Sequence, residues 1–223
     1  MDRQKLIQDF EATIGLAVGV VISQNTSHLI TKWITTGEIT VMFAIVVITL
    51  SVYIMKFFIG SLFVQSRTLR RFLLGRQYIE GTWFDIMRKD NKVAEVGFSR
   101  ISYTHKNIEF SGEDYNLEMD QCFPFRAEIV KMHWPTLHYV YTSNRSDTKE
   151  QTTKGYGEID FQTERRGSPK KYVGKYFVLR GTEKIFFEGI KLNEKKDKTL
   201  IDLLDDPAHR KEALKQLLKK YGH

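Results

Sequence analysis

A long apolar run constrains this chain more than any other feature. The segment Ile39–Val64 (ITVMFAIVVITLSVYIMKFFIGSLFV) holds one charged residue, Lys56, and no proline. A helix needs roughly 20 apolar residues to cross the hydrocarbon core of a bilayer, which is about 30 Å thick. Helices buried in soluble domains are rarely so apolar for so long. The run therefore predicts a transmembrane helix, with Lys56 late in the span, where its stem can reach toward the headgroups.

A second uncharged segment precedes this run. Residues Ala12–Thr31 contain no Asp, Glu, Lys or Arg, although the stretch Ser23–His28 is polar. Polar side chains can hydrogen-bond across a helix interface in the membrane, and small residues allow close packing there. We therefore expect a hairpin of two transmembrane helices. A cleaved signal peptide is the alternative, but Asp9 and Glu11 would fall in its basic region, and no small-residue cleavage site follows.

The distribution of charge indicates how the hairpin is oriented. Residues 1–65 contain as many acidic as basic residues, so the net charge of +7 belongs entirely to residues 66–223. Positive charge that flanks a span tends to stay on the cytoplasmic side. We therefore expect the C-terminal part in the cytoplasm, and two spans bring the N-terminus there too. The arginines that follow the span are Arg67, Arg70, Arg71 and Arg76.

Beyond these arginines the sequence changes to short strand-like stretches. From Tyr78 to about Leu192, segments rich in Tyr, Phe, Val and Ile alternate with turn residues, a pattern typical of antiparallel sheet. The pair Ser111-Gly112 is expected to end the third strand. Full closure would remove the exposed edges of such a sheet, and a barrel of eight strands can hold one small ligand. The expected strands are Tyr78–Met87, Val93–Tyr103, Asn107–Phe110, Phe125–Trp134, Leu137–Ser143, Gly155–Gln162, Tyr172–Leu179 and Lys184–Ile190.

The expected fold is therefore a membrane-anchored all-β protein. Two N-terminal transmembrane helices are followed by a small antiparallel, eight-stranded, lipocalin-like β-barrel with a C-terminal helix. Residues 1–75 would form the two-helix transmembrane region with its basic linker. Residues 76–223 would form the cytoplasmic ligand-sensing barrel domain.

The C-terminal helix is expected at about residues 199–221. Asp206-Pro207 marks a break, with Asp as the cap and Pro in the first turn. One face of the helix is apolar, and we expect it to pack on the barrel. Self-association through this face is the alternative. The residues of the face are Leu214, Leu217, Leu218 and Tyr221.

The sequence has none of the motifs that assemble a catalytic site. The phosphate loop G-x-x-x-x-G-K-[ST], the G-x-S-x-G elbow and H-E-x-x-H are absent. The stretch Gly155–Gly157 lies in a strand and opens no helix, so it is not a dinucleotide fingerprint. His133 and His138 lack the acid or cysteine partners of a metal site, and the single cysteine, Cys122, cannot form a disulfide within the chain. We expect no enzyme, no cofactor and no metal.

A set of aromatic and basic residues on the expected strands remains. Nucleobases stack on flat side chains, and guanidinium groups hold phosphates. Alternatively, the aromatic residues fill the core and the arginines face water. The candidate ligand-binding residues are Trp83, Arg126, Tyr139, Tyr141 and Arg180.

The order of segments, together with the first strand, matches a known architecture. Two spans run into a short basic linker, and the stretch Tyr78–Trp83 (YIEGTW) supplies a Gly-x-Trp first strand. This resembles the two-transmembrane β-barrel effectors associated with CD-NTases in bacterial CBASS anti-phage systems. The likeness covers nearly the whole chain in architecture, and the residues that match are Gly81 and Trp83.

The resemblance implies a function. The cytoplasmic barrel would sense a cyclic dinucleotide made during phage infection. Binding would drive oligomerisation, and the clustered spans would disrupt the bacterial inner membrane. The implied partners are the cyclic dinucleotide, the lipid bilayer and further copies of the chain, with no DNA or RNA.

Two other functions fit the same sequence. Gly-x-Trp also opens lipocalin-type barrels, so a membrane-tethered carrier of a lipid or another apolar molecule is one alternative. A structural module whose filled barrel binds a protein is the other. Arginines and tyrosines directed into the barrel would favour the effector. An aliphatic cavity would favour the carrier, and the absence of a cavity the structural module.

Overall fold

The computed structural model describes residues 37–89, 92–104, 107–144, 152–163, 167–178 and 184–222. The chain divides into two compact units, Met1–Arg70 and Arg71–His223. The expected first transmembrane helix, within residues 12–31, lies outside the described residues.

The first unit contains one long apolar helix, α2 (Gly37–Gln65), which covers the apolar run of the sequence. Its segment Val46–Gln65 is long and apolar enough to cross a membrane, and it is the one such helix in the described part of the chain. Large apolar side chains along it are exposed, such as Tyr53, Phe57 and Phe58. This exposure suits a lipid-facing helix better than the core helix of a soluble domain, because a core helix buries such side chains.

A short basic helix, α3 (Arg67–Leu74), follows α2 directly. Ser66 separates the two helices, and its Oγ accepts a hydrogen bond from the Leu69 backbone N–H at 3.2 Å. That bond satisfies one of the N–H groups left without a partner at a helix start. The guanidinium of Arg70 is buried and donates to the carbonyl oxygen of Phe63 at 2.9 Å and to that of Val64. Hydrogen bonds from the Arg70 side chain therefore satisfy carbonyl groups at the end of the apolar helix.

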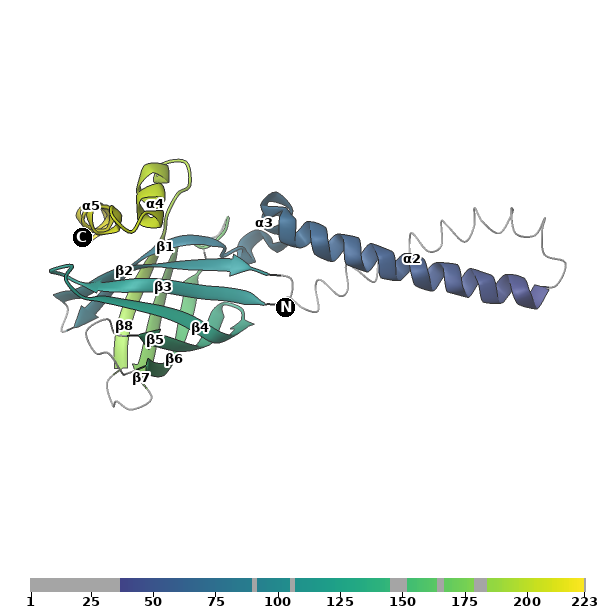
Figure 1. Ribbon diagram of the computed structural model, residues 1–223, viewed down its shortest axis with the longest axis horizontal. Coiled ribbons are helices and arrows are strands. Elements are labelled where there is room, and N and C mark those ends of the chain that lie inside the picture. Colours follow the sequence, from purple (N-terminus) through teal and green to yellow (C-terminus); the bar gives the residue numbers. More distant parts are fainter. Residues whose placement is uncertain are drawn as a thin grey trace. The chain divides into compact units, whose positions relative to one another are not determined.

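The second unit is a closed antiparallel barrel of eight strands in sequence order, as predicted. Each strand pairs with the next, and β1 closes the ring against β8. Figure 1 shows the strands wrapping around one interior. The strands are β1 (Gly81–Lys89), β2 (Lys92–Tyr103), β3 (Ile108–Asn116), β4 (Cys122–His133), β5 (Thr136–Asn144), β6 (Thr152–Gln162), β7 (Lys171–Val178) and β8 (Lys184–Lys191).

The end of the barrel where β1 begins is filled with side chains. Trp83 is fully buried, and its ring centroid lies 4.9 Å from that of Tyr172 and 5.6 Å from that of Phe161. Its indole N–H donates to the carbonyl oxygen of Ile79 at 3.1 Å. A buried indole needs a partner for its N–H, and this bond supplies it. Trp83 is therefore a core residue that closes this end of the barrel.

Two C-terminal helices, α4 (Lys198–Asp205) and α5 (Arg210–Tyr221), cover the outer face of β1 and β2 (Figure 1). The expected apolar face packs there, since Leu214 and Leu217 are fully buried in one cluster with Phe84. Packing on the barrel is therefore confirmed. The break at Asp206-Pro207 is longer than predicted. Pro207 lies before α5 rather than in its first turn. The Asp206 carboxylate accepts a hydrogen bond from the Ala208 backbone N–H at 3.0 Å within the connecting turn.

The carboxylate of Asp197 ties the two C-terminal helices together just before α4. It accepts hydrogen bonds from the backbone N–H of Asn193 at 2.7 Å and from Lys220 Nζ at 2.5 Å. The hydroxyl of Tyr221 donates to it as well, at 3.2 Å. Burial opposes ionisation, but these bonds outweigh it and lower the pKa of Asp197. The end of the chain is thereby fastened to the segment that leaves the barrel.

The third strand is longer than the sequence predicted. Ser111-Gly112 was expected to be a turn, but β3 continues through it to Asn116. Gly112 pairs with Phe125 of β4, and a Cβ at Gly112 would lie 2.8 Å from the Phe125 ring. The glycine therefore marks a close approach within a strand rather than a turn. The extra residues bring Asp114 into the barrel wall.

Removing the Trp83 ring should destabilise the barrel strongly. In a fragment of residues 71–223, Trp83→Ala should lower the free energy of unfolding by about 3–5 kcal/mol, because it leaves a large cavity at the filled end. Trp83→Phe keeps most of the packing and should cost less. Urea unfolding followed by far-UV circular dichroism measures both. A loss below about 1 kcal/mol for the alanine variant, or a fragment without a sheet-dominated spectrum, would contradict this account.

Candidate ligand-binding site

The barrel is hollow in the half opposite the filled end. A cavity of about 370 Å³ lies there, close to the low end of the range for small-molecule sites. Its lining comes from the strand ends next to the β1–β2, β3–β4, β5–β6 and β7–β8 connections. Deep lining residues such as Tyr139 are buried, whereas Val178 and Ile185 near those connections are partly exposed. The cavity therefore opens toward this end of the barrel.

Large rings in this half lie against glycines of the adjacent strand. Tyr141 pairs with Gly155 across β5 and β6, and Tyr139 pairs with Gly157. A Cβ at either glycine would lie 2.3 Å from a ring carbon of its tyrosine. The rings of Tyr139 and Tyr141 therefore rest against the β6 backbone. The glycines of the Gly155–Gly157 stretch have this structural role.

Aromatic side chains form much of the cavity wall. The ring centroids of Tyr139 and Tyr141 lie 5.9 Å apart, and Tyr176 lies 5.7 Å from Tyr141. Burial raises the pKa of both Tyr139 and Tyr141, so their hydroxyls stay protonated at neutral pH. Each hydroxyl can then donate as well as accept a hydrogen bond.

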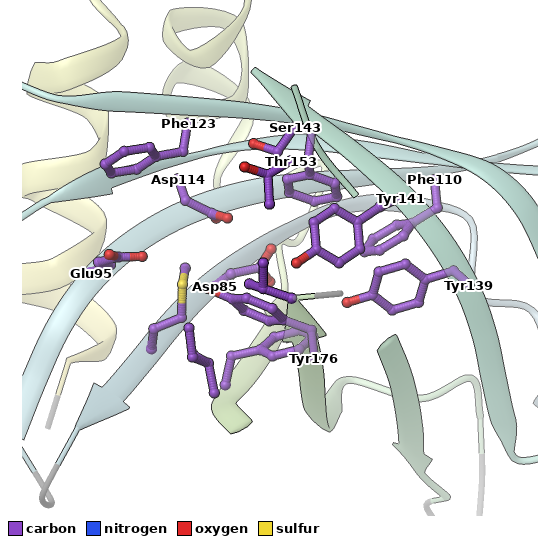
Figure 2. A pocket seen from close by; sticks show the side chains of 15 residues that line it. Asp85, Glu95, Phe110, Asp114, Phe123, Tyr139, Tyr141, Ser143, Thr153 and Tyr176 are labelled. Carbon is purple, nitrogen blue, oxygen red and sulfur yellow. The ribbon is translucent and has the colours of Figure 1, made fainter. Parts of the chain in front are cut away.

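Three acidic side chains also line the cavity: Asp85, Glu95 and Asp114. Asp85 on β1 and Asp114 on β3 both pair with Gly97 on the strand between them. A Cβ at Gly97 would lie 2.2 Å from Oδ1 of Asp114, so the missing side chain makes room for that carboxyl. Figure 2 shows the Asp114 carboxyl and the hydroxyls of Tyr139 and Tyr141 directed into the same space.

The two aspartates differ in their partners. The Tyr172 hydroxyl donates to Asp85, and Ser99 Oγ lies 3.2 Å from that hydroxyl. Burial raises the pKa of Asp85 to about 7, although the hydrogen bonds from Tyr172 and Ser99 oppose the shift. Burial also raises the pKa of Asp114 well above its ordinary value. The charges of the neighbouring acids, Asp85 and Glu95 among them, raise it further.

The structure separates the residues predicted to bind ligand. Tyr139 and Tyr141 line the cavity together. Trp83 lies in the filled end and does not. Arg126 is exposed on β4, one residue after the cavity-lining Phe125, so strand alternation turns it to the outer face. Arg180 lies outside the described residues.

Sequence reasoning missed the acidic part of the site. Asp85 follows Trp83 by two residues on the first strand, so period-two alternation alone could have placed it inside the barrel. Asp114 had no such signal, because the strand was expected to end before it. The arginines sought for a phosphate have no counterpart here: among the cavity-lining residues that the structure describes, none is Lys or Arg.

The raised pKa of Asp85 makes barrel stability depend on pH. The folded state holds a proton on Asp85 up to about pH 7, whereas the unfolded chain releases it near pH 4. Stability should therefore fall as pH rises between these values, by a few kcal/mol in order of magnitude, since each pKa unit is worth about 1.4 kcal/mol. Asp85→Asn should reduce this dependence and raise stability at pH 8 relative to wild type.

Urea unfolding of residues 71–223 at pH 5 and pH 8 measures this effect. Asp202→Asn, at an exposed position on α4, serves as the matched control and should leave the pH dependence unchanged. If Asp85→Asn lowered stability equally at both pH values, the carboxyl would not be the group that titrates.

Comparison with known proteins assigns no family. The chain matches no protein-family model and no curated protein. A function therefore has to be argued from the cavity and the apolar helix.

Proposed function

We propose that this protein is a membrane-anchored effector whose barrel binds a cyclic dinucleotide. Binding drives self-association, and the clustered membrane helices disrupt the bacterial inner membrane. The observation that carries the proposal is the aromatic-walled cavity, open at one end, in a barrel that follows a membrane-type helix in the same chain. The protein is not an enzyme in this proposal, and both termini are cytoplasmic.

The cavity walls support the ligand part of the proposal. Nucleobases stack on aromatic rings, at about 1–3 kcal/mol per base. Tyr139, Tyr141 and Tyr176 supply rings on neighbouring parts of the wall. An apolar carrier would need a lining without ionisable groups, because an unpaired buried carboxyl disfavours an apolar ligand. The acidic residues of this cavity therefore favour a polar, aromatic ligand over a lipid.

The membrane part rests on the composition of α2 and α3. The exposed apolar side chains of α2 suit lipid contact. Arg67 and Arg71 are exposed on α3 directly after it, where arginines interact favourably with anionic headgroups and favour the cytoplasmic side. Anchoring in a membrane raises the effective concentration of the barrels, so weak contacts between them become sufficient. Ligand promotes assembly only if it binds the assembled form more tightly.

Loss of one stacking ring should weaken binding. In full-length protein in lipid nanodiscs, Tyr141→Ala should reduce affinity for the bound cyclic dinucleotide by about 1–3 kcal/mol, or roughly 5- to 150-fold. Tyr156→Ala is the matched control, because Tyr156 lies on the same barrel with 36% of its surface exposed. Calorimetry against a panel of cyclic di- and trinucleotides measures both.

Two further experiments test self-association and membrane disruption. Light scattering in detergent should show larger particles with ligand than without it, and binding without such growth would remove the clustering step. Expression together with the activating nucleotide should permeabilise cells, and deletion of residues 1–65 should abolish this while sparing binding. Failure of every nucleotide in the panel to bind folded protein would contradict the proposal itself.

A further inference from the structure

The charge of the cavity places a restriction on how a nucleotide can sit in it. Asp85, Glu95 and Asp114 all face the interior. A phosphate among these groups would meet repulsion in a low-dielectric space, where charges interact strongly. Within the described lining no cation offsets this. The part of the ligand that enters must therefore be uncharged or rich in N–H donors.

Of the two aspartates, Asp114 is the better placed to receive such donors. Asp85 is already engaged by the Tyr172 hydroxyl. In contrast, no hydrogen bond from the described part of the chain reaches the Asp114 carboxyl, whose ionisation is opposed by burial and by the neighbouring acids. A carboxyl held beside a cavity in this way gains most from a ligand that donates to both of its oxygens.

The surrounding rings fit a flat heterocycle beside that carboxyl. Tyr139 and Tyr141 face the interior from β5, and Phe125 lies on β4 next to them, with its ring centroid 6.5 Å from that of Tyr141. A base stacked on these rings would direct its hydrogen-bonding edge along the cavity wall. The Asp114 carboxyl points into the same space (Figure 2).

We propose that the cavity is selective for guanine: the base enters between the rings, and its N1–H and N2–H donate to the two carboxylate oxygens of Asp114. This rests on the proposed function, since it names the part of the cyclic dinucleotide that the barrel recognises. Guanine presents two adjacent N–H donors on its Watson–Crick edge. Adenine and cytosine present one donor beside an acceptor, and uracil presents one donor between two carbonyl oxygens. Only guanine therefore matches an ionised carboxylate at both oxygens.

The phosphates remain at the mouth of the cavity in this arrangement. The strand ends there carry basic residues, at Lys89 on β1, Lys92 on β2 and Lys184 on β8. Phosphates at this position stay in contact with water and need no buried counter-charge. In this arrangement the base, with its N–H donors, lies inside the cavity, and the phosphates lie outside it.

Guanine binding should lower the pKa of Asp114. Burial and the charges of Asp85, Glu95 and the adjoining Glu113 raise the pKa of Asp114 in the cavity. Tyr139, Tyr141 and Tyr176 face the same space but keep their protons at neutral pH, because burial raises the pKa of each. Two guanine N–H donors favour the ionised carboxyl, so affinity should increase with pH.

Calorimetry on full-length protein in nanodiscs tests the proposal. The probes are cyclic di-GMP, 3′,3′-cyclic GMP-AMP, cyclic di-AMP and cyclic di-UMP, with spermidine as an organic cation. The guanine-containing ligands should bind at least about tenfold more tightly than the others, an amount that one charge-assisted hydrogen bond can supply. Repeating the titration in buffers of different ionisation enthalpy should show proton release for the guanine ligands alone.

Asp114→Asn distinguishes recognition from a purely structural role. An amide presents one acceptor and one donor, which match adenine and not guanine. The variant should lose about 10- to 100-fold in affinity for cyclic di-GMP and should prefer cyclic di-AMP. Asp202→Asn, exposed on α4, should change neither affinity. A simple loss of fold would weaken every ligand equally and could not reverse the preference.

The possible outcomes separate this inference from the proposed function. Binding of cyclic dinucleotides without a guanine preference, or with a preference that Asp114→Asn leaves intact, would overturn the guanine site and leave the receptor function standing. No binding of any cyclic dinucleotide would overturn both. Tight binding of spermidine that Asp114→Asn abolishes, without nucleotide binding, would also overturn both and make the cavity a site for organic cations.

Discussion

The division of the barrel interior into a filled half and a hollow half depends on how its aromatic side chains are accommodated. An eight-stranded barrel is just wide enough for its own side chains to fill it. At the filled end Trp83 and Phe161 pack toward the centre, with ring centroids 5.6 Å apart. In the hollow half Tyr139 and Tyr141 lie over glycines of the adjacent strand. At the filled end Tyr172 also lies over a glycine, Gly189, so the difference there is the fully buried Trp83, against which Phe161 and Tyr172 pack.

The buried acidic residues of the cavity oppose the stability of the barrel. A carboxyl in the interior is disfavoured in its charged form, and both Asp85 and Asp114 respond with raised pKa values. The Tyr172 hydroxyl compensates Asp85 in part, whereas no hydrogen bond from the described residues reaches the Asp114 carboxyl. Uncompensated groups of this kind mark functional sites more often than structural ones. The two faces of β3 illustrate the contrast. Glu113 faces α5 and is held by the Arg210 guanidinium at 2.7 Å, whereas its neighbour Asp114 faces the cavity.

The sequence predicted the barrel well because each strand has a clear pattern of β-formers and turns. Strand number, antiparallel pairing and closure agree with the structure, as does the packing of Leu214 and Leu217. The prediction was wrong at Gly112, which allows a close contact within a strand instead of forming a turn. Gly112 lies within a strand because the Phe125 ring occupies the position of its absent side chain, and a tertiary contact of this kind leaves no trace in local sequence. Because the strand was expected to end at this glycine, Asp114 was not recognised as a residue of the barrel wall.

The central claim is that ligand enters the hollow half of the barrel, and methyl NMR of isoleucine-labelled full-length protein in nanodiscs tests it most directly. Ile185 lines the cavity near its mouth, Ile159 is fully buried in the core, and Ile129 is exposed on β4. Titration with the tightest-binding cyclic dinucleotide should shift the Ile185 methyl resonance strongly and leave those of Ile159 and Ile129 nearly unchanged. A shift confined to Ile129, with Ile185 unaffected, would place the ligand on the outer surface and contradict the account.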